Sequence, residues 1–368
     1  MSEETEILIA TVDRLFGDLA QADAHGSAPA RGALAWDDIE ASGIGSLLVP
    51  ESAGGFGGSF KDAYVVLARA GWHTLALPIA ETLLARALLA GAGTDPPPGP
   101  ASIAVDARGA LGGGAGDFHY SGALAAVPWG ALVEHVLFET LHRGEMRLIC
   151  LAVADAQARH RATNLASEPR DRLQFEAAPI RICGADPGRA GVPAFASDAH
   201  GGVIALAALL RVAQIAGALQ WVLQACIEHT STRRQFGRSL SQFQVIQHQL
   251  ALLAEETSAV TCAALAASIA ADRGDAQLEI AAAKLRANQA IGIATSIAHQ
   301  VHGAVGVTQE HALQRATRRL WAWRAEFGGE RDWALTLGRS VVAAGAERLW
   351  PTLTARGDRT GTIDSEKP

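Results

Sequence analysis

The stretch Thr232–Gln249, TRRQFGRSLSQFQVIQHQ, decides the fold assignment of this chain. Arg233 carries a planar, permanently charged guanidinium that can pair with a diphosphate through two hydrogen bonds. Phe236 adds a flat apolar face, and Gly237 lets the backbone turn so that another helix can begin within a few residues. Gln244 can hydrogen-bond a ligand without adding charge. The alternative is that the paired arginines only complement the dipole at a helix end.

A second stretch, His299–Leu313, contains a glutamine followed by a glycine-rich turn. Gln300 precedes Gly303 and Gly306, and glycine allows a positive φ or the close approach of a ligand to the backbone. The same stretch has His-x-x-His spacing, but no carboxylate or thiol stands at ligand spacing to complete a metal site. It therefore predicts a turn that faces a ligand, without a metal.

Together, the two stretches resemble the flavin-contacting motifs of the acyl-CoA dehydrogenase family. In that family, the Arg of the first motif and the turn of the second meet the adenine diphosphate half of FAD, which is bound mainly by a neighbouring subunit. Ala304 stands where the family usually has a second glycine. The resemblance implies FAD as the cofactor, with the following residues as its contacts: Arg233, Phe236, Gln244, Gln300 and Gly303.

The N-terminal third carries a further match to the same family. Trp36, Gly43, the run Leu47–Glu51 and two Gly-Gly pairs resemble its opening pattern, Trp…Gly…Val-Pro-Glu…Gly-Gly…Gly. The run Leu77–Thr82 is also typical of the family. The resemblance thus covers both ends of the chain, whereas the middle is weakly matched.

Composition favours a soluble protein with several packed regions. The 368 residues are 49% hydrophobic, which is enough for two or three sizeable cores. A net charge of −7, with no basic stripe of interleaved aromatics, argues against nucleic acid as the main partner. The four cysteines are scattered without a Cys-x-x-Cys pair, which indicates buried thiols in a reducing compartment. The acidic start Met1–Glu6 differs from a basic signal peptide, so we expect a cytoplasmic protein.

Changes of periodicity divide the chain and predict a mainly α fold with a small central β domain. Residues 1–98 have helical spacing broken by Gly and Pro and predict an N-terminal helical domain. Residues 99–200 have short apolar runs between Gly, Asp and Arg and predict a barrel-like middle β domain. Residues 201–356 predict a C-terminal four-helix bundle that carries the FAD-contacting motifs. The polar residues 357–368 predict a mobile tail.

Four apolar faces are expected to form the bundle. The most apolar stretch, Val203–Ile227, is interrupted by Arg and Gln, which favours a buried bundle helix over a membrane span. The other three faces lie at Val245–Leu265, Ile280–Ile297 and Leu335–Leu349. In the middle region, Gly112–Gly116 lacks the residues that follow the glycines of a phosphate-binding loop, and it predicts a flexible turn.

The catalytic base of the family has no clear counterpart here. In most members, a Glu before Gly-Thr removes the α-proton of an acyl-CoA thioester while the β-hydride passes to flavin N5. Counting from the second motif, this position falls on Phe327. Glu326 lies one residue before it and Glu330 is the reserve, and either carboxylate could instead pair with a neighbouring arginine in solvent. Other members carry the Glu near position 207, which is an alanine in this chain.

The adenine-side motifs are thus present, whereas the family's Thr-Glu-Pro…Gly-Ser-Asp stretch, which holds the flavin ring, is missing. Some bacterial acyl-CoA dehydrogenases, including steroid side-chain enzymes, have two unlike subunits, and this chain resembles the shorter one. The resemblance implies dehydrogenation of an acyl-CoA in fatty acid or steroid side-chain β-oxidation, with a second acyl-CoA dehydrogenase subunit as partner and electron-transfer flavoprotein as acceptor. Two alternatives stay open: a self-sufficient homo-oligomer that uses Glu326, and a non-catalytic family member without flavin.

Overall fold

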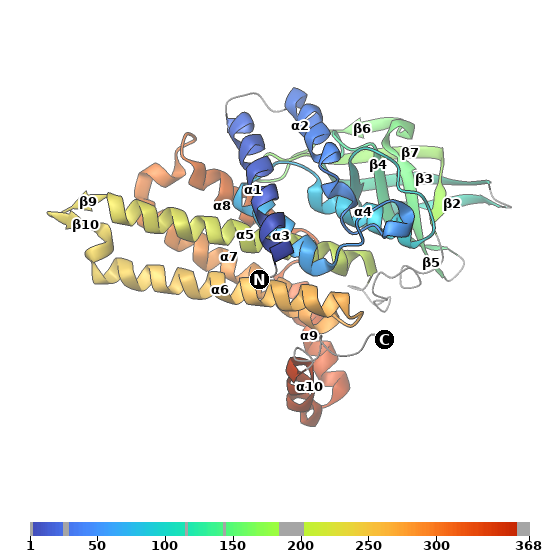
Figure 1. The fold of residues 1–368 in the computed structure, drawn as a ribbon. Coiled ribbons are helices and arrows are strands. Elements are labelled where there is room, and N and C mark those ends of the chain that lie inside the picture. The colour runs from blue at the N-terminus through green and yellow to red at the C-terminus, as the bar shows by residue number, and fades with distance from the viewer. Residues whose placement is uncertain (1–2, 25–28, 115–116, 143–144, 184–201, 359–368) are drawn as a thin grey trace.

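A computed structural model describes residues 3–24, 29–114, 117–142, 145–183 and 202–358 (Figure 1). Long helices surround one central helix, and the β region lies at one side of them. The predicted fold class, mainly α with a small β domain in the middle, is confirmed. In the described part of the chain, four α-helices precede the β region: α1 Glu3–Ala24, α2 Pro29–Ala41, α3 Phe60–Trp72 and α4 Ile79–Gly91.

The β region consists of two four-stranded sheets with the strand orders β1-β4-β5-β8 and β2-β3-β7-β6. Strands β1 and β4 are parallel, and all other pairs in these two sheets are antiparallel. Tyr120 contacts both Phe138 and Phe175 in the core of this region. The strands are β1 Ala101–Ile103, β2 Asp106–Gly114, β3 Asp117–Pro128, β4 His135–His142, β5 Glu145–Ala152, β6 Ala158–His160, β7 Arg170–Pro179 and β8 Arg181–Cys183.

The turn predicted over Gly112–Gly116 was wrong for its first three residues. Gly112, Gly113 and Gly114 belong to β2 and pair with His119, Phe118 and Asp117 of β3. Backbone pairing with a neighbouring strand therefore overrides the low strand preference of glycine here. Residues 115 and 116 lie outside the described part of the chain.

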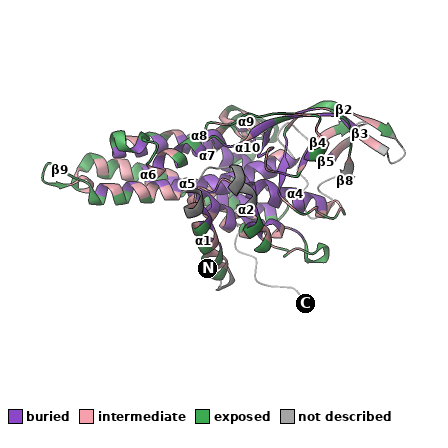
Figure 2. Ribbon diagram, turned by 90° about the horizontal axis from the view of Figure 1, so that it is seen from above, coloured by how far each residue is buried: buried purple, intermediate pink, exposed green. Residues whose placement is uncertain are grey.

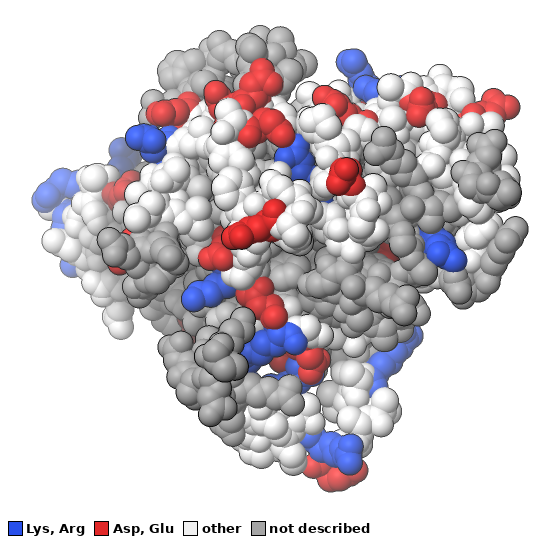
Figure 3. Space-filling view, turned by 45° about the vertical axis from the view of Figure 1, so that its right-hand side comes forward, with Lys and Arg blue, Asp and Glu red and all other residues white. Residues whose placement is uncertain are grey.

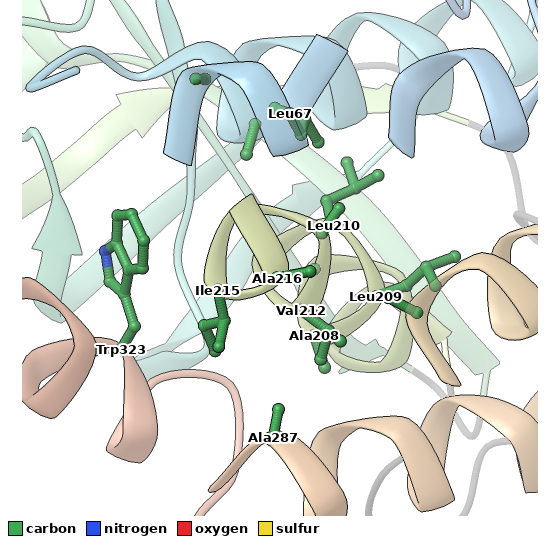
Figure 4. Packing of buried hydrophobic residues seen from close by; sticks show 14 of the residues in the cluster. Leu67, Ala208, Leu209, Leu210, Val212, Ile215, Ala216, Ala287 and Trp323 are labelled. Atoms are coloured by element: carbon green, nitrogen blue, oxygen red, sulfur yellow. The ribbon is translucent and has the colours of Figure 1, made fainter. Parts of the chain in front are cut away.

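Helix α5, Gly202–Thr232, is the centre of the molecule. Its most apolar 18-residue window has a mean hydropathy of 1.9 and is 89% buried, so the prediction of a buried bundle helix is confirmed. Leu67 of α3, Ala287 of α7 and Trp323 of α8 approach it from three sides (Figure 4). Helices α3 and α5 cross closely because each has a glycine at the contact. A Cβ on Gly217 of α5 would lie 1.7 Å from Ala68 O, and a Cβ on Gly71 of α3 would lie 2.0 Å from Gln214 O.

The bundle differs from the prediction in its fourth helix. The stretch Leu335–Leu349 is not one helix, because Gly345 has a φ of 88° and separates α9 from α10. The helix that packs on both α5 and α7 is instead α8, which buries Leu313, Leu320 and Trp323. The helices of this region are α6 Gln244–Asp272, α7 Gln277–His302, α8 Ala312–Ala325, α9 Glu330–Ala344 and α10 Ala346–Asp358.

Helix α10 projects from the main body, and α9, which packs on α7, connects it to the bundle (Figure 1). The first two residues of the predicted mobile tail, Gly357 and Asp358, belong to α10, and residues 359–368 lie outside the described part of the chain. On the face shown in Figure 3, acidic and basic side chains of the described residues are interspersed rather than gathered by sign.

Candidate functional site

The motif at Arg233 lies where α5 ends. The two-stranded hairpin β9 Arg234–Gln235 and β10 Arg238–Ser239 follows, joined by a two-residue turn. Both turn residues have positive φ, 50° for Phe236 and 78° for Gly237, as a tight hairpin turn requires. The Phe236 side chain is 90% exposed. A large aromatic residue that is both exposed and in this sparsely populated backbone region points to a functional role.

The backbone of Arg233 is fixed, whereas its guanidinium is free. Its N–H donates to His229 O at 2.9 Å, and its carbonyl oxygen accepts from Leu240 N at 2.9 Å. Within the described residues, its guanidinium makes no hydrogen bond or ion pair. Arg234 differs, because its Nη2 donates to Gly237 O at 3.1 Å within the hairpin. Arg233 is therefore the arginine that can bind an anion, and Gln244, the exposed first residue of α6, follows on the same connection.

The second motif lies where α7 ends. Gly303 follows the helix with a φ of 67°, and no heavy atom lies within 4 Å of a Cβ built on it. Position 303 therefore favours glycine because of its positive φ and not because of crowding, and the space beside it is open. Gly306 differs, because its Cβ would lie 2.8 Å from His302 Cβ and 2.9 Å from Leu313 Cδ2. Gln300 is exposed in the last turn of α7.

A pair of stacked histidines brings the two motifs together. The rings of His229 on α5 and His302 on α7 are 4.4 Å apart between centroids, with an interplanar angle of 26°. His302 also contacts His311 edge to face at 5.2 Å. Burial lowers the pKa of His302 to about 4, and burial also lowers the pKa of His229. His302 is therefore uncharged at neutral pH, and the positive charge of this end comes from Arg233, Arg234 and Arg238.

Glu326, the sequence-based candidate for the base, lies in a buried cluster of charges. Its Oε1 accepts from Arg170 Nε at 2.8 Å, Arg170 Nη2 at 2.5 Å and Asn164 Nδ2 at 3.2 Å. Its Oε2 lies 3.0 Å from Arg211 Nη2. The side chain is 15% exposed. Two guanidinium groups thus hold a carboxylate that a base would need to present to a substrate.

Three further members complete this cluster, which joins all parts of the fold. Arg211 Nη2 donates to Glu81 Oε1 of α4 at 2.5 Å. Glu168 accepts from Arg319 Nε of α8 at 2.5 Å and lies 3.2 Å from Arg170. Burial alone would raise the pKa of Glu168, but the guanidinium groups of Arg319 and Arg170 hold it below its usual range. We call Glu81, Glu168, Arg170, Arg211, Arg319 and Glu326 the interdomain charge cluster.

The charge cluster and the Arg233 end lie apart in one chain. Arg211 and Arg233 are separated by about six turns of α5, roughly 33 Å at about 1.5 Å per residue. The structure therefore brings the first and second motifs together but does not bring Glu326 to them. The reserve candidate Glu330 begins α9 and pairs with Arg324 at 2.6 Å, with 40% of its side chain exposed.

Sequence reasoning missed Lys284, which holds the loop that carries Glu326. Its Nζ donates to Asn288 Oδ1 at 2.8 Å and to the carbonyl oxygens of Trp323 at 3.0 Å and Arg324 at 3.2 Å. The side chain is fully buried, and burial together with nearby Arg211 lowers its pKa to about 7. The sequence feature that could have identified this residue is the position of a lysine inside the apolar face Ile280–Ile297. It caps the end of α8 from a neighbouring helix.

Comparison with known proteins agrees with this geometry. Residues 201–331 match the family described as acyl-CoA dehydrogenase, C-terminal domain. A relative named acyl-CoA dehydrogenase IpdE2 from Mycobacterium tuberculosis is 30% identical over 326 residues, which cover 84% of this chain and 89% of the relative. The chain therefore belongs to the acyl-CoA dehydrogenase family, a family of oxidoreductases that act on the CH–CH group of acyl-CoA.

Two solved structures share the fold. A variant of the Tcur3481–Tcur3483 steroid ACAD has a TM-score of 0.82 at 23% identity, with 94% of this chain and 99% of that chain covered. The ChsE4–ChsE5 complex from Mycobacterium tuberculosis has a TM-score of 0.79 at 20% identity, with 92% and 97% covered. At these identities, the likeness shows the fold alone.

Proposed function

We propose that this chain is one subunit of a two-subunit, FAD-dependent acyl-CoA dehydrogenase, in which it completes the FAD site of a longer partner. The observation that carries the proposal is the separation between a free anion-binding end at Arg233 and a Glu326 carboxylate already held by two arginines. Such a chain can hold part of a cofactor, but it cannot perform the proton abstraction by itself.

The residues at the Arg233 end fit the adenine diphosphate half of FAD. The free guanidinium supplies a charge-assisted, bidentate contact for a diphosphate. The open space beside Gly303 lets the backbone approach a ligand, and exposed Phe236 offers an aromatic face. Gln244 and Gln300 are exposed and can hydrogen-bond without adding charge. FAD, when bound, supplies the hydride acceptor for the dehydrogenation.

The residues of the β region do not fit the flavin ring half in the same way. Strand β1 ends at Ile103 and β2 begins at Asp106, so only Ala104 and Val105 connect them. This connection has no room for a loop of the kind that the family uses to hold the ring, and neither residue has a side-chain hydroxyl. The ring pocket and the base are therefore assigned to the partner.

The named relatives support the substrate class and the partner. IpdE2 is named an acyl-CoA dehydrogenase, one structural neighbour is described as a steroid ACAD, and another is a complex of two different chains. We infer an acyl-CoA from fatty acid or steroid side-chain β-oxidation as the substrate, electron-transfer flavoprotein as the acceptor and the cytoplasm as the location. The acyl group itself depends on pocket side chains of the partner.

The test is the flavin absorption of the purified chain, alone and co-purified with a longer family member encoded beside it. We expect the chain alone to be nearly colourless and the complex to be yellow. In the complex, Arg233→Ala should weaken FAD binding by roughly 10- to 150-fold, because it removes a charge-assisted contact of about 1.5–3 kcal/mol. Arg234→Ala is the matched control and should retain FAD.

Two results would contradict the proposal. The first is a yellow homo-oligomer that dehydrogenates acyl-CoA without a partner, which would favour the self-sufficient enzyme. The second is an Arg233→Ala complex with unchanged flavin affinity, measured by fluorescence titration. A complex that forms but never binds flavin would favour a non-catalytic family member.

A further inference from the structure

The ring of His302 lies where three helices meet. It is buried, and its Nδ1–H donates to Ala298 O at 2.9 Å, one turn earlier in α7. From α5, the ring of His229 stacks on it, and Cys226 Sγ lies 3.9 Å from His302 Nδ1. His311, whose side chain caps the first turn of α8, contacts the same ring edge to face. The ring of His302 therefore links the ends of α5 and α7 to the start of α8.

Each histidine of the stack is joined directly to a residue expected to contact FAD. The carbonyl oxygen of His229 accepts the N–H of Arg233 at 2.9 Å, so the two residues lie on adjacent turns of one helix face. His302 is the last residue of α7, and Gly303 follows it with its positive φ. A displacement of either ring would thus move one FAD contact relative to the other.

The two motifs differ in how firmly the fold holds them. The hairpin of β9 and β10 lies at one end of the long helices, and β9 is exposed (Figure 2). The turn Gly303–Val307 is instead packed on His302, because a Cβ on Gly306 would lie 2.8 Å from His302 Cβ. The stack connects the packed turn to the helix end that carries Arg233.

The chemistry of the stack suits a contact that fixes geometry. Aromatic pairs stabilise a contact beyond the area that they bury, and they prefer defined arrangements of the two rings. Burial lowers the pKa of His302 to about 4, so this ring is neutral at pH 7 and does not repel Arg233. The guanidinium group can therefore be held close to the stack while its charge remains available for a diphosphate.

We propose that the stack of His229 on His302 holds the two FAD-contacting motifs at a fixed separation, and that both histidines are positioning residues for the adenine diphosphate half of FAD. This inference rests on the proposed function. A cofactor that contacts both Arg233 and Gly303 binds more tightly when the two are already in place, because ordering them during binding lowers the affinity. Loss of either ring should therefore weaken FAD binding although neither motif loses a contact residue.

The test measures the dissociation constant of FAD by flavin fluorescence in the complex with the longer subunit. His229→Ala should weaken FAD binding by roughly 3- to 10-fold, because it removes one ring of an aromatic pair. His229→Phe keeps a ring in the stack and should restore the wild-type affinity. The matched control is His299→Ala: this histidine is also half-buried, but its ring hydrogen-bonds Thr317 of α8 at 2.9 Å. The control should leave FAD binding unchanged.

A double-mutant cycle distinguishes the stack from two independent structural roles. His229→Ala and His302→Ala each remove the same contact, so the double variant should bind FAD about as weakly as the weaker single variant. Losses that multiply in the double variant would overturn the proposal. A loss in His229→Ala that His229→Phe does not restore would assign His229 to a direct hydrogen bond with FAD and would also overturn it. Circular dichroism checks folding, and the half-buried His229 provides the decisive pair of variants if His302→Ala does not fold.

Amide hydrogen exchange of the chain without FAD tests the stack independently of the proposed function. His302→Ala should speed exchange at Leu240 N, which donates to Arg233 O at the base of the hairpin, and His299→Ala should not. Unchanged exchange at the hairpin would overturn the proposed link between the motifs. If exchange responds to His302→Ala but the complex never binds FAD, the link stands and the proposed function fails.

Discussion

Replacing Glu326 by Gln removes one negative charge from the interdomain charge cluster while it preserves the shape of the side chain. The carboxylate lies between Arg170 and Arg211, at 2.5 Å from Nη2 of the first and 3.0 Å from Nη2 of the second. The two arginine side chains are 8% and 2% exposed. After the replacement, both guanidinium groups would remain buried with one carboxylate fewer to neutralise them.

The expected cost follows from this geometry. Removing one partner of a buried ion pair typically costs about 3–5 kcal/mol. Because Glu326 is 15% exposed, water can reach it in part, and we expect a loss of about 3 kcal/mol in the free energy of unfolding. The matched control is Glu330→Gln, because the pair of Glu330 with Arg324 is 40% and 32% exposed. Exposed pairs of this kind contribute roughly 0–1 kcal/mol.

The assay measures two quantities on the same variants. Urea unfolding followed by circular dichroism gives the stability of the chain, and reduction of a dye by the complex with acyl-CoA gives the rate. If Glu326 is only a member of the charge cluster, its replacement by Gln should lower the stability and leave the rate of the assembled complex nearly unchanged. If Glu326 is a catalytic base, the replacement should leave the stability nearly unchanged and lower the rate by about 10²–10⁴. A Glu326→Gln complex that is fully stable but inactive would refute the proposed structural role.

Three further changes have defined outcomes. Gly303→Val should lower the flavin content of the complex with little loss of helical signal, because a branched residue disfavours a φ of 67°; unchanged flavin loading would assign this glycine to packing. Gly217→Ala should destabilise the chain by more than about 2 kcal/mol in thermal unfolding, because its Cβ would lie 1.7 Å from Ala68 O. The control is Gly292→Ala on α7, where a Cβ meets no atom within 4 Å, and this variant should be neutral or slightly stabilising. Lowering the pH from 7 to 5 should lower the free energy of unfolding by about 2 kcal/mol through His302. The pKa of His302 in the folded chain is about 4, below the unfolded value of 6.5, so the unfolded chain binds more protons in this range. A His302→Asn variant should lose that part of the pH dependence.

What could be predicted from the sequence depended on short-range spacing. Arg233, Phe236 and Gly237 are neighbours in the chain, so their spacing alone indicated a helix end and a tight turn. The partners of Glu326 could not be predicted in this way, because Arg170 lies 156 residues away and is brought to it by the packing of β7 on the bundle. The sequence pattern suggested only a neighbouring arginine, which is correct for Glu330.

The helices show the same division between local and distant information. The apolar face of α5 is long and continuous, and it was recognised as a buried helix. Helix α8 was not predicted, because its several arginines narrow the apolar stripe that faces α5 and α7. Arg319, one of these arginines, is itself buried through Glu168 and through the carbonyl oxygen of Thr74. The burial of this arginine depends on partners far away in the chain and leaves no signal in the local apolar pattern.

The interdomain charge cluster has a consequence for how the chain acquires its structure. The ion pair of Glu81 with Arg211 joins residues that are 130 positions apart, and the hydrogen bond from Arg319 to the carbonyl oxygen of Thr74 joins residues that are 245 positions apart. In each pair, the N-terminal residue is synthesised long before its partner. Contacts between such distant residues slow folding, because long loops must close before any contact compensates them. Until α8 and the loop after it have emerged from the ribosome, Glu168 lacks Arg319 and Arg170 lacks Glu326, so the charge cluster stays incomplete. The N-terminal helices and the β region can therefore reach their final packing only when the chain is nearly complete.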